Sequence, residues 1–254
     1  MSNLNYKETI SLAVSIYKRS FKVAFALAFM LSFISEFCMV YMMNHGMLEF
    51  IENDGKEIPA NFPSRDVLAL MMIVILVATV FVYAMILLLQ GILIKQDMKY
   101  SDAMKLALQI FSKRVFAFIG AFFLSMIAVS LMVMFLQYLG MFVVILLFVT
   151  VFPCVLLEQK NVFDAVKSNF DILKSDTFYM VRISFSILAL MIVKSMITIG
   201  LVYALRTMSI EVDPLESSIQ NILVTIAESF IMPFILAITV ATFLATRKEK
   251  TNCL

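Results

Sequence analysis

The sequence predicts an all-α, polytopic membrane protein with six transmembrane helices and three cytoplasmic amphipathic helices in a threefold internal repeat. The first observation is composition, because the 254 residues are 62% hydrophobic and only 15% charged. Soluble domains are nearer half apolar and a quarter charged. The second observation is a pattern, because a short amphipathic stretch followed by a long apolar span occurs three times. A net charge of +2 is too small to indicate a nucleic-acid partner.

The three amphipathic stretches begin near Tyr6, Tyr100 and Val162. Their aligned positions i, i+4, i+7, i+8 and i+11 form one face of an α-helix. An acid lies two residues into each stretch, where the helix dipole favours negative charge, and basic residues end each stretch. The aligned faces are Tyr6, Ile10, Ala13, Val14, Tyr17; Tyr100, Met104, Ala107, Leu108, Phe111; and Val162, Val166, Asn169, Phe170, Leu173.

Six segments are long and apolar enough to cross a bilayer, which takes about 20 residues. The third and fourth are separated only by a short turn at Gly140, which predicts a tight helical hairpin with glycine at the turn. We expect a single integral membrane domain over residues 1–254, with repeat units of roughly 5–94, 99–157 and 161–246. The predicted spans are Phe21–Met43, Val67–Ile94, Val115–Tyr138, Leu139–Leu157, Thr177–Leu205 and Ile219–Thr246.

The distribution of basic residues predicts the orientation. Of the 20 Lys and Arg residues, 15 lie before or in the first turn of the first span, between the second and third, between the fourth and fifth, or after the sixth. Because basic residues are retained on the cytoplasmic side, both termini and all three amphipathic helices are expected there.

The amphipathic helices allow two interpretations. They form either a structural collar that anchors the bundle at the cytoplasmic surface, or a surface that senses or recruits anionic lipid. The second interpretation assigns the headgroup contacts to six basic residues near the ends of these helices. They are Lys18, Arg19, Lys22, Lys113, Arg114 and Lys174.

Two charges lie well inside predicted spans, where ionisable residues are costly and are candidates for function. Lys194 in the fifth span and Glu228 in the sixth are expected at similar depth on antiparallel neighbours. They are interpreted as a structural ion pair, as part of a proton or solute pathway, or as charges without mutual contact. Pro233 removes a backbone donor, which predicts a hinge and a free carbonyl at Ser229 beside Glu228.

Further polar positions and one proline are also expected inside or near the membrane. Pro153 is expected to kink the fourth span as a second hinge. Gln90 and Gln137 are expected to form hydrogen bonds between helices. Glu36 lies nearer the outer face and is expected to reach the interface.

No pattern in the chain indicates catalysis. The only histidine is His45, and no His-Glu-x-x-His motif, phosphate-binding glycine loop or Cys/His cluster occurs. The sequence therefore predicts a protein that is not an enzyme and that has no catalytic, cofactor-binding or metal-binding residues.

One stretch of the chain carries a family resemblance. FPCVLLEQKNVFDAVKSNFDILK, residues 152–174, has a proline late in the fourth span, then an apolar run, a polar turn and an amphipathic helix with Ala165 and Ser168. In this it resembles the YciC-like family of uncharacterised bacterial inner-membrane proteins, as do residues 90–114 and the order of the six spans. The resemblance implies a multi-pass protein of the bacterial inner (plasma) membrane with no assigned activity.

The sequence therefore favours a structural or lipid-associated envelope component. The alternative is a small-solute or ion transporter or channel that uses the Lys194–Glu228 pair. Expected partners are membrane lipids and other envelope proteins, but not nucleic acid. No feature of the sequence sets the number of subunits.

Overall fold

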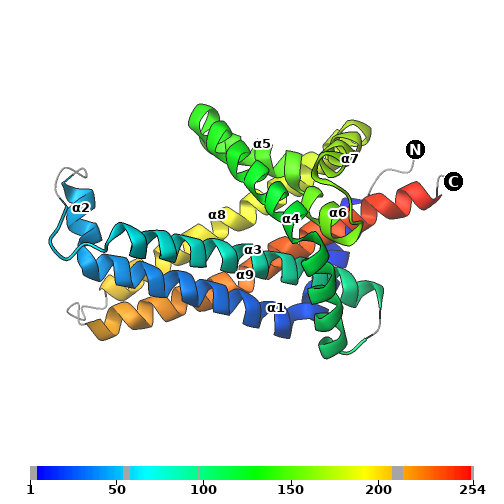
Figure 1. The fold of residues 1–254 in the computed structure, drawn as a ribbon. Helices are drawn as coiled ribbons and strands as arrows, with labels where there is room; N and C mark the ends of the chain where they lie inside the picture. The colour runs from blue at the N-terminus through cyan, green and yellow to red at the C-terminus, as the bar shows by residue number, and fades with distance from the viewer. Residues whose placement is uncertain (1–4, 54–57, 97, 208–213, 253–254) are drawn as a thin grey trace.

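A computed structural model of the chain describes residues 5–53, 58–96, 98–207 and 214–252 (Figure 1). These ranges are almost entirely helical, and no strand occurs within them. The elements are α1 (Tyr6–Met42), the π-helical segment η1 (Met43–Met47), α2 (Leu48–Glu52), α3 (Arg65–Lys95), α4 (Tyr100–Leu136), α5 (Tyr138–Phe148), α6 (Val151–Leu157), α7 (Val162–Ser175), α8 (Thr177–Thr207) and α9 (Pro214–Asn252).

Six stretches of the described residues are long and apolar enough to cross a membrane, so the predicted all-α class with six membrane-length apolar segments is confirmed. The fourth stretch contains both α5 and α6 and is the shortest of the six, with 19 residues against the about 20 that a bilayer core takes. The chain is therefore a multi-pass membrane protein. The stretches are Tyr6–Met47, Arg65–Lys95, Tyr100–Leu136, Leu139–Leu157, Thr177–Gly200 and Ile222–Arg247.

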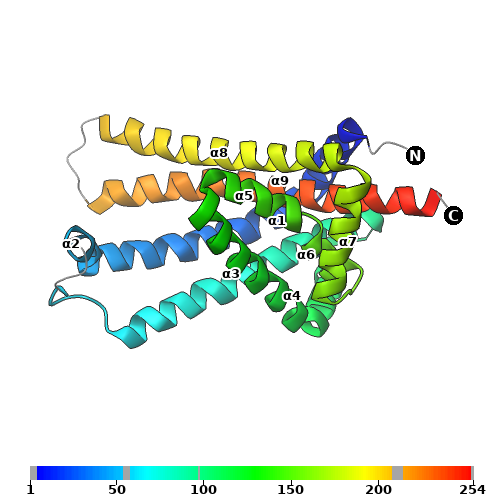
Figure 2. The same ribbon diagram turned by 90° about the horizontal axis from the view of Figure 1, so that it is seen from above.

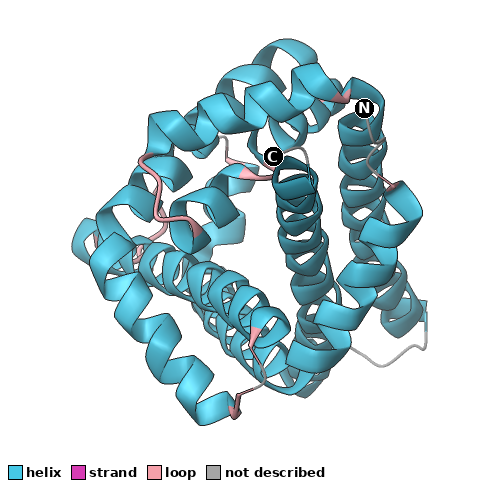
Figure 3. Cartoon of the chain, turned by 90° about the vertical axis from the view of Figure 1, so that its right-hand side faces the viewer, coloured by secondary structure: helices cyan, strands magenta, loops and turns pink. Residues whose placement is uncertain are grey.

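Four long helices, α1, α3, α8 and α9, lie side by side and form the body of the molecule (Figures 1 and 2). The start of α1 and the end of α9 lie at one end, which we call the basal end, and α2 lies at the opposite, distal end. Helix α9 packs against α1, α3, α6 and α8, and its last turns emerge near the middle of the basal face (Figure 3). It is thus the central element of the bundle.

Small residues on α1 allow the close packing of this body. Ala24 and Ala28 are buried where α1 meets its neighbours, as a small-xxx-small spacing predicts. Next to them, the ring of Phe230 on α9 stacks on Phe21 of α1 and lies tilted against Phe25, with centroid distances of 5.6 and 4.9 Å. The α1–α9 contact therefore combines close backbone approach with aromatic packing.

The basal half of α3 is the most completely enclosed segment. Residues 84–93 are buried on every side of the helix, and a helix that is apolar all round requires such an environment. Gly91 permits the contact with α6, because a Cβ atom there would lie only 2.6 Å from a methyl carbon of Leu157.

Helices α4 and α5 form the predicted hairpin, but the turn differs from the prediction. The residue with positive φ is Gln137 (φ 49°), not the glycine. Gly140 lies in the first turn of α5, where a Cβ atom would overlap the carbonyl oxygen of Met132 on α4. Glycine is thus needed for the close approach of two backbones rather than for a left-handed turn.

The three surface helices follow the repeat, with one correction to the expected face. The aligned positions Leu108 and Phe170 are exposed, so the predicted stripe is wrong at i+8. Burial instead follows i+3 and i+7, where small or polar side chains occur. The buried equivalents are Thr9, Ala103 and Ala165, followed by Ala13, Ala107 and Asn169.

The surface helices also differ in how they join the spans. In the first two repeats the surface helix continues without interruption into the membrane-length helix, as α1 and α4. In the third, Asp176 leaves the helical conformation between α7 and α8 (φ −145°, ψ 75°). Its carboxylate then accepts a hydrogen bond from the Tyr179 amide and caps α8.

Candidate functional site

Two polar groups stand out within an otherwise apolar molecule. The first is a charge pair on α8 and α9 in the distal half of the body, and the second is a network at the basal end. We describe the charge pair first, since the sequence identifies its two members.

The structure brings Lys194 and Glu228 together. Lys194 Nζ on α8 lies 2.8 Å from Glu228 Oε1 on α9, and the two side chains are 36% and 25% exposed. The interpretation without mutual contact is therefore excluded. Each charge lowers the cost of placing the other in a medium of low dielectric constant.

Two further polar residues lie within electrostatic range of Glu228. They are Glu36 on α1 and Tyr83 on α3. Glu36 is half-buried, and its expected position at the membrane interface stays a prediction. Tyr83 was not singled out from the sequence, because it belongs to no motif.

Pro233 does not interrupt α9, which is helical from Pro214 to Asn252. The Gln90 side chain on α3 donates a hydrogen bond from Nε2 to the Pro233 carbonyl at 2.8 Å, and both residues are buried. Gln90 therefore forms the hydrogen bond between helices that the sequence predicted. The Ser229 hydroxyl donates to the Thr225 carbonyl one turn earlier. Gln137, the other predicted partner, lies exposed at the hairpin turn.

Pro153 lies beside an actual break in the fourth span, although the break is three residues earlier than the proline. Helix α5 ends at Phe148 and α6 begins at Val151. Pro153 occupies the first turn of α6, where a missing N–H is tolerated. The predicted fourth span is therefore two helices rather than one kinked helix.

The side chain of Asn169 on α7 satisfies the backbone at this break. Its Oδ1 accepts hydrogen bonds from the Thr150 amide (3.2 Å) and hydroxyl (2.7 Å). Its Nδ2 donates to the carbonyls of Leu146 (3.1 Å) and Leu147 (2.8 Å). Asn169 is fully buried, so this one side chain replaces hydrogen bonds that the helix has lost.

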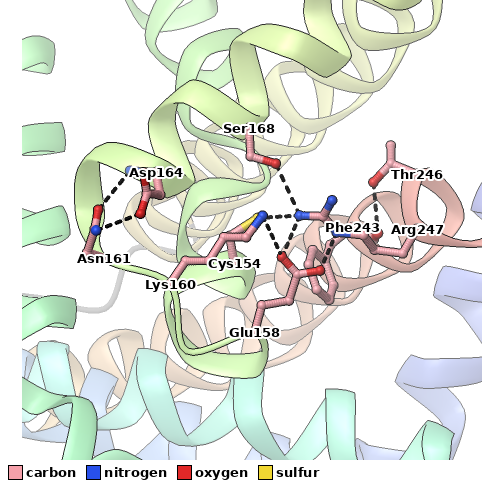
Figure 4. A network of polar contacts seen from close by, with 9 residues as sticks. All are labelled: Cys154, Glu158, Lys160, Asn161, Asp164, Ser168, Phe243, Thr246 and Arg247. Atoms are coloured by element: carbon pink, nitrogen blue, oxygen red, sulfur yellow. Dashed lines mark hydrogen bonds and ion pairs between the residues drawn. The ribbon is translucent and has the colours of Figure 1, made fainter. Parts of the chain in front are cut away.

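The basal network centres on Arg247 of α9 (Figure 4). Its guanidinium pairs with Glu158 at the end of α6 and donates to the Ser168 hydroxyl of α7 at 3.1 Å. It also donates to Cys154 Sγ at 3.6 Å. Lys160 lies 3.2 Å from the same Glu158 carboxylate. The network therefore fixes α6, α7 and α9 to one another.

An aromatic ring supports the same cation. The Arg247 guanidinium lies 5.6 Å from the centroid of the Phe243 ring, and Lys95 Nζ lies 5.9 Å from it. Sequence reasoning missed this network, because Glu158 and Arg247 are 89 residues apart and belong to no local motif.

The six residues assigned to headgroup contacts divide into two groups. Two of them are half-buried and engaged with protein. Arg19 donates to the Gln96 carbonyl at 3.5 Å, and Arg114 donates to Gln159 Oε1 at 3.3 Å. The other four side chains are exposed, and they lie on three different helices. They are Lys18, Lys22, Lys113 and Lys174.

The fold and these sites define the class: a multi-pass, all-helical membrane protein with a charged group inside its bundle and a polar network at one end. No protein-family model, no curated protein and no solved structure matches the chain.

Proposed function

We propose that this protein is a lipid-associated structural component of the bacterial inner membrane, with its basal end and both termini in the cytoplasm. In this proposal it catalyses no reaction, and its partners are anionic lipids and other envelope proteins. The observation that carries the proposal is the exposure of Lys18, Lys22, Lys113 and Lys174 on three helices that begin or end at the basal end. A basic side chain near an anionic surface contributes about 1 kcal/mol of attraction.

The lipid preference of the reconstituted protein tests this function. Spin-labelled anionic and zwitterionic lipids report which headgroups occupy the protein boundary. We expect anionic lipid to be enriched around the native chain, and the double change Lys113→Glu and Lys174→Glu to reduce that enrichment. Arg65→Glu is the matched control, because Arg65 is exposed at the distal end. Equal boundary occupancy for the native and the double-variant chains would overturn the proposed lipid role.

The family and location belong to the same proposal. Residues 152–174 support membership in the YciC-like family, since they hold the proline of α6, the polar turn and α7 in the order of that family. Reporter enzymes fused after Leu254 test the location. Activity only on the outer side of the inner membrane would contradict it.

A second candidate function is ion or small-solute movement through the distal half of the body. The specific observation in its favour is the Lys194–Glu228 ion pair, whose side chains are partly exposed on two membrane-length helices. Flux into liposomes tests it, with Lys194→Met/Glu228→Gln as the variant. Flux that is lost in a folded variant would support transport. Absence of flux for the native chain would eliminate this candidate and leave the pair as a packing element.

A further inference from the structure

The connection between α4 and α5 differs in chemistry from the two other connections that turn back toward the basal end. Residues 44–66 carry Glu49, Glu52 and Asp66 among other charges, and residues 206–216 also contain several charged residues. Residues 115–157, by contrast, contain no charged residue at all. Only Gln137 is strongly polar near the α4–α5 turn. The first two connections suit an aqueous surface, whereas this one suits hydrocarbon.

The direction of the hairpin agrees with its chemistry. Helices α4 and α5 leave the axis of the body at a steep angle, and their joined ends lie level with the middle of α3 (Figures 1 and 2). Helices α1 and α8 continue to the distal end in the same views. The hairpin therefore stops well short of the level that the body reaches.

The lengths of α5 and α6, which lead from the turn back to the basal end, also indicate that the hairpin does not reach the distal level. At a rise of about 1.5 Å per residue, the 11 residues of α5 extend about 16 Å and the 7 residues of α6 about 10 Å. A hydrocarbon core is about 30 Å thick. The whole stretch Leu139–Leu157 has 19 residues and would extend about 28 Å if straight, and the steep inclination of the hairpin to the body reduces the depth that this length reaches (Figure 1).

Several backbone groups at the irregular points of the hairpin have partners within the protein. At the turn, the Gly140 amide donates to the Gln137 carbonyl and the Gln137 amide to the Val133 carbonyl, at 3.0 and 2.9 Å. At the α5–α6 break, buried Asn169 supplies the missing partners. An unpaired backbone group costs several kcal/mol in hydrocarbon, so each of these bonds lowers the cost of irregular backbone at membrane depth.

The flanks of the turn carry large apolar side chains with no protein cover. Met134 is 79% and Phe135 75% exposed, and Leu139 is also largely exposed. Groups of this size at an aqueous tip would leave a large apolar area in water. Lipid tails are the occupant that matches an uncharged surface of this kind.

We infer that α4, α5 and α6 form a re-entrant hairpin, which enters the membrane from the basal side, turns within the hydrocarbon and returns to the same side. Its exposed flank is covered by acyl chains of the basal leaflet. Four helices, α1, α3, α8 and α9, then cross the membrane completely. The positive-inside rule does not distinguish a re-entrant hairpin from a hairpin that crosses the membrane twice, because in both cases the two ends of the hairpin lie on the same side.

Accessibility of single cysteines to a membrane-impermeant maleimide tests the inference. The changes are Gln137→Cys at the turn and Ala60→Cys in the exposed distal connection, each in a full chain whose three native cysteines are replaced by alanine. We expect labelling of the Ala60→Cys chain in sealed membranes, and labelling of the Gln137→Cys chain only after denaturation. Labelling of both chains at the same rate in sealed membranes would overturn the inference.

A second measurement avoids replacement of the buried Cys38 and Cys154. In the native-cysteine chain, Gln137→Arg places a charge at the turn and Ala60→Arg places one in the distal connection. A turn within hydrocarbon predicts several-fold less membrane-inserted protein for the first variant and a native amount for the second. Native amounts of both variants would contradict the re-entrant hairpin.

Discussion

Loss of the Glu158–Arg247 pair should show that α6, α7 and α9 act as one unit. The test is a double-mutant cycle, which compares Glu158→Gln, Arg247→Met and the variant that carries both substitutions. Glu158 is 25% exposed and Arg247 20%, whereas Lys160, which also contacts the carboxylate, is 35% exposed. Arg247 additionally bonds Ser168 on α7. The cycle therefore probes a junction of three helices rather than an isolated surface pair.

The expected loss in the free energy of unfolding lies between the values for fully buried and fully exposed ion pairs. Breaking a fully buried pair costs about 3–5 kcal/mol because a charge is left without its partner. An exposed pair contributes about 0–1 kcal/mol. With about a fifth to a quarter of each side chain exposed, we expect each single change to lower the free energy of unfolding by about 2 kcal/mol. The double variant should lose much less than the sum of the singles, since neither charge is then stranded.

The assay is reversible unfolding of the purified protein in mild detergent, followed by helical circular dichroism. Lys160→Met with Glu158→Gln provides a matched control cycle, whose coupling should stay below about 1 kcal/mol because Lys160 is the more exposed partner. Additive losses in the Glu158–Arg247 cycle would refute the reasoning. They would mean that solvent screens the pair despite its burial.

Two further substitutions have matched controls within the chain. Gly140→Ala should destabilise the hairpin and lower the melting temperature, because the added Cβ would overlap the Met132 carbonyl; Gly120→Ala, whose Cβ would meet its nearest atom at 3.5 Å, should raise stability by up to about 1 kcal/mol. A lower melting temperature for both variants would contradict the packing assigned to the turn. Asn169→Ala should cost about 3 kcal/mol or more, since several buried backbone groups lose their partner; Asn161→Ala, which removes an exposed helix cap, should cost only about 1 kcal/mol. Equal losses for the two asparagines in denaturant unfolding would argue against a role for Asn169 at the helix break.

Much of the fold follows from the sequence because the bilayer limits the choices. Apolar runs of membrane length predict helices, since hydrocarbon offers the backbone no other partners. The positions at which the first and third surface helices begin could also be predicted from the sequence. Asn5 and Asn161 cap α1 and α7 through their side-chain oxygens, and an acid follows each in the first turn. The contact of Lys194 with Glu228 could be predicted because helical rise converts residue number into depth.

Other features could not be predicted, and the reason is that they depend on which helices meet. Arg247 and Glu158 become partners only when α9 packs beside α6. The break before Pro153 depends on Asn169, which lies in a different helix. The exposure of Leu108 and Phe170 has a similar origin. An apolar stripe indicates which face avoids water, but lipid and protein are equally acceptable neighbours for it.

The third repeat shows how one substitution in a repeated pattern changes the architecture. At the same buried position the first two repeats have Ala13 and Ala107, and the third has Asn169. Alanine permits close helix packing but offers no hydrogen bond, so a broken helix beside it would leave backbone groups unpaired. Asn169 supplies both a donor and an acceptor to the α5–α6 break. The break lies in the second repeat and its polar partner in the third, so α7 must pack beside the α5–α6 junction for the break to be tolerated.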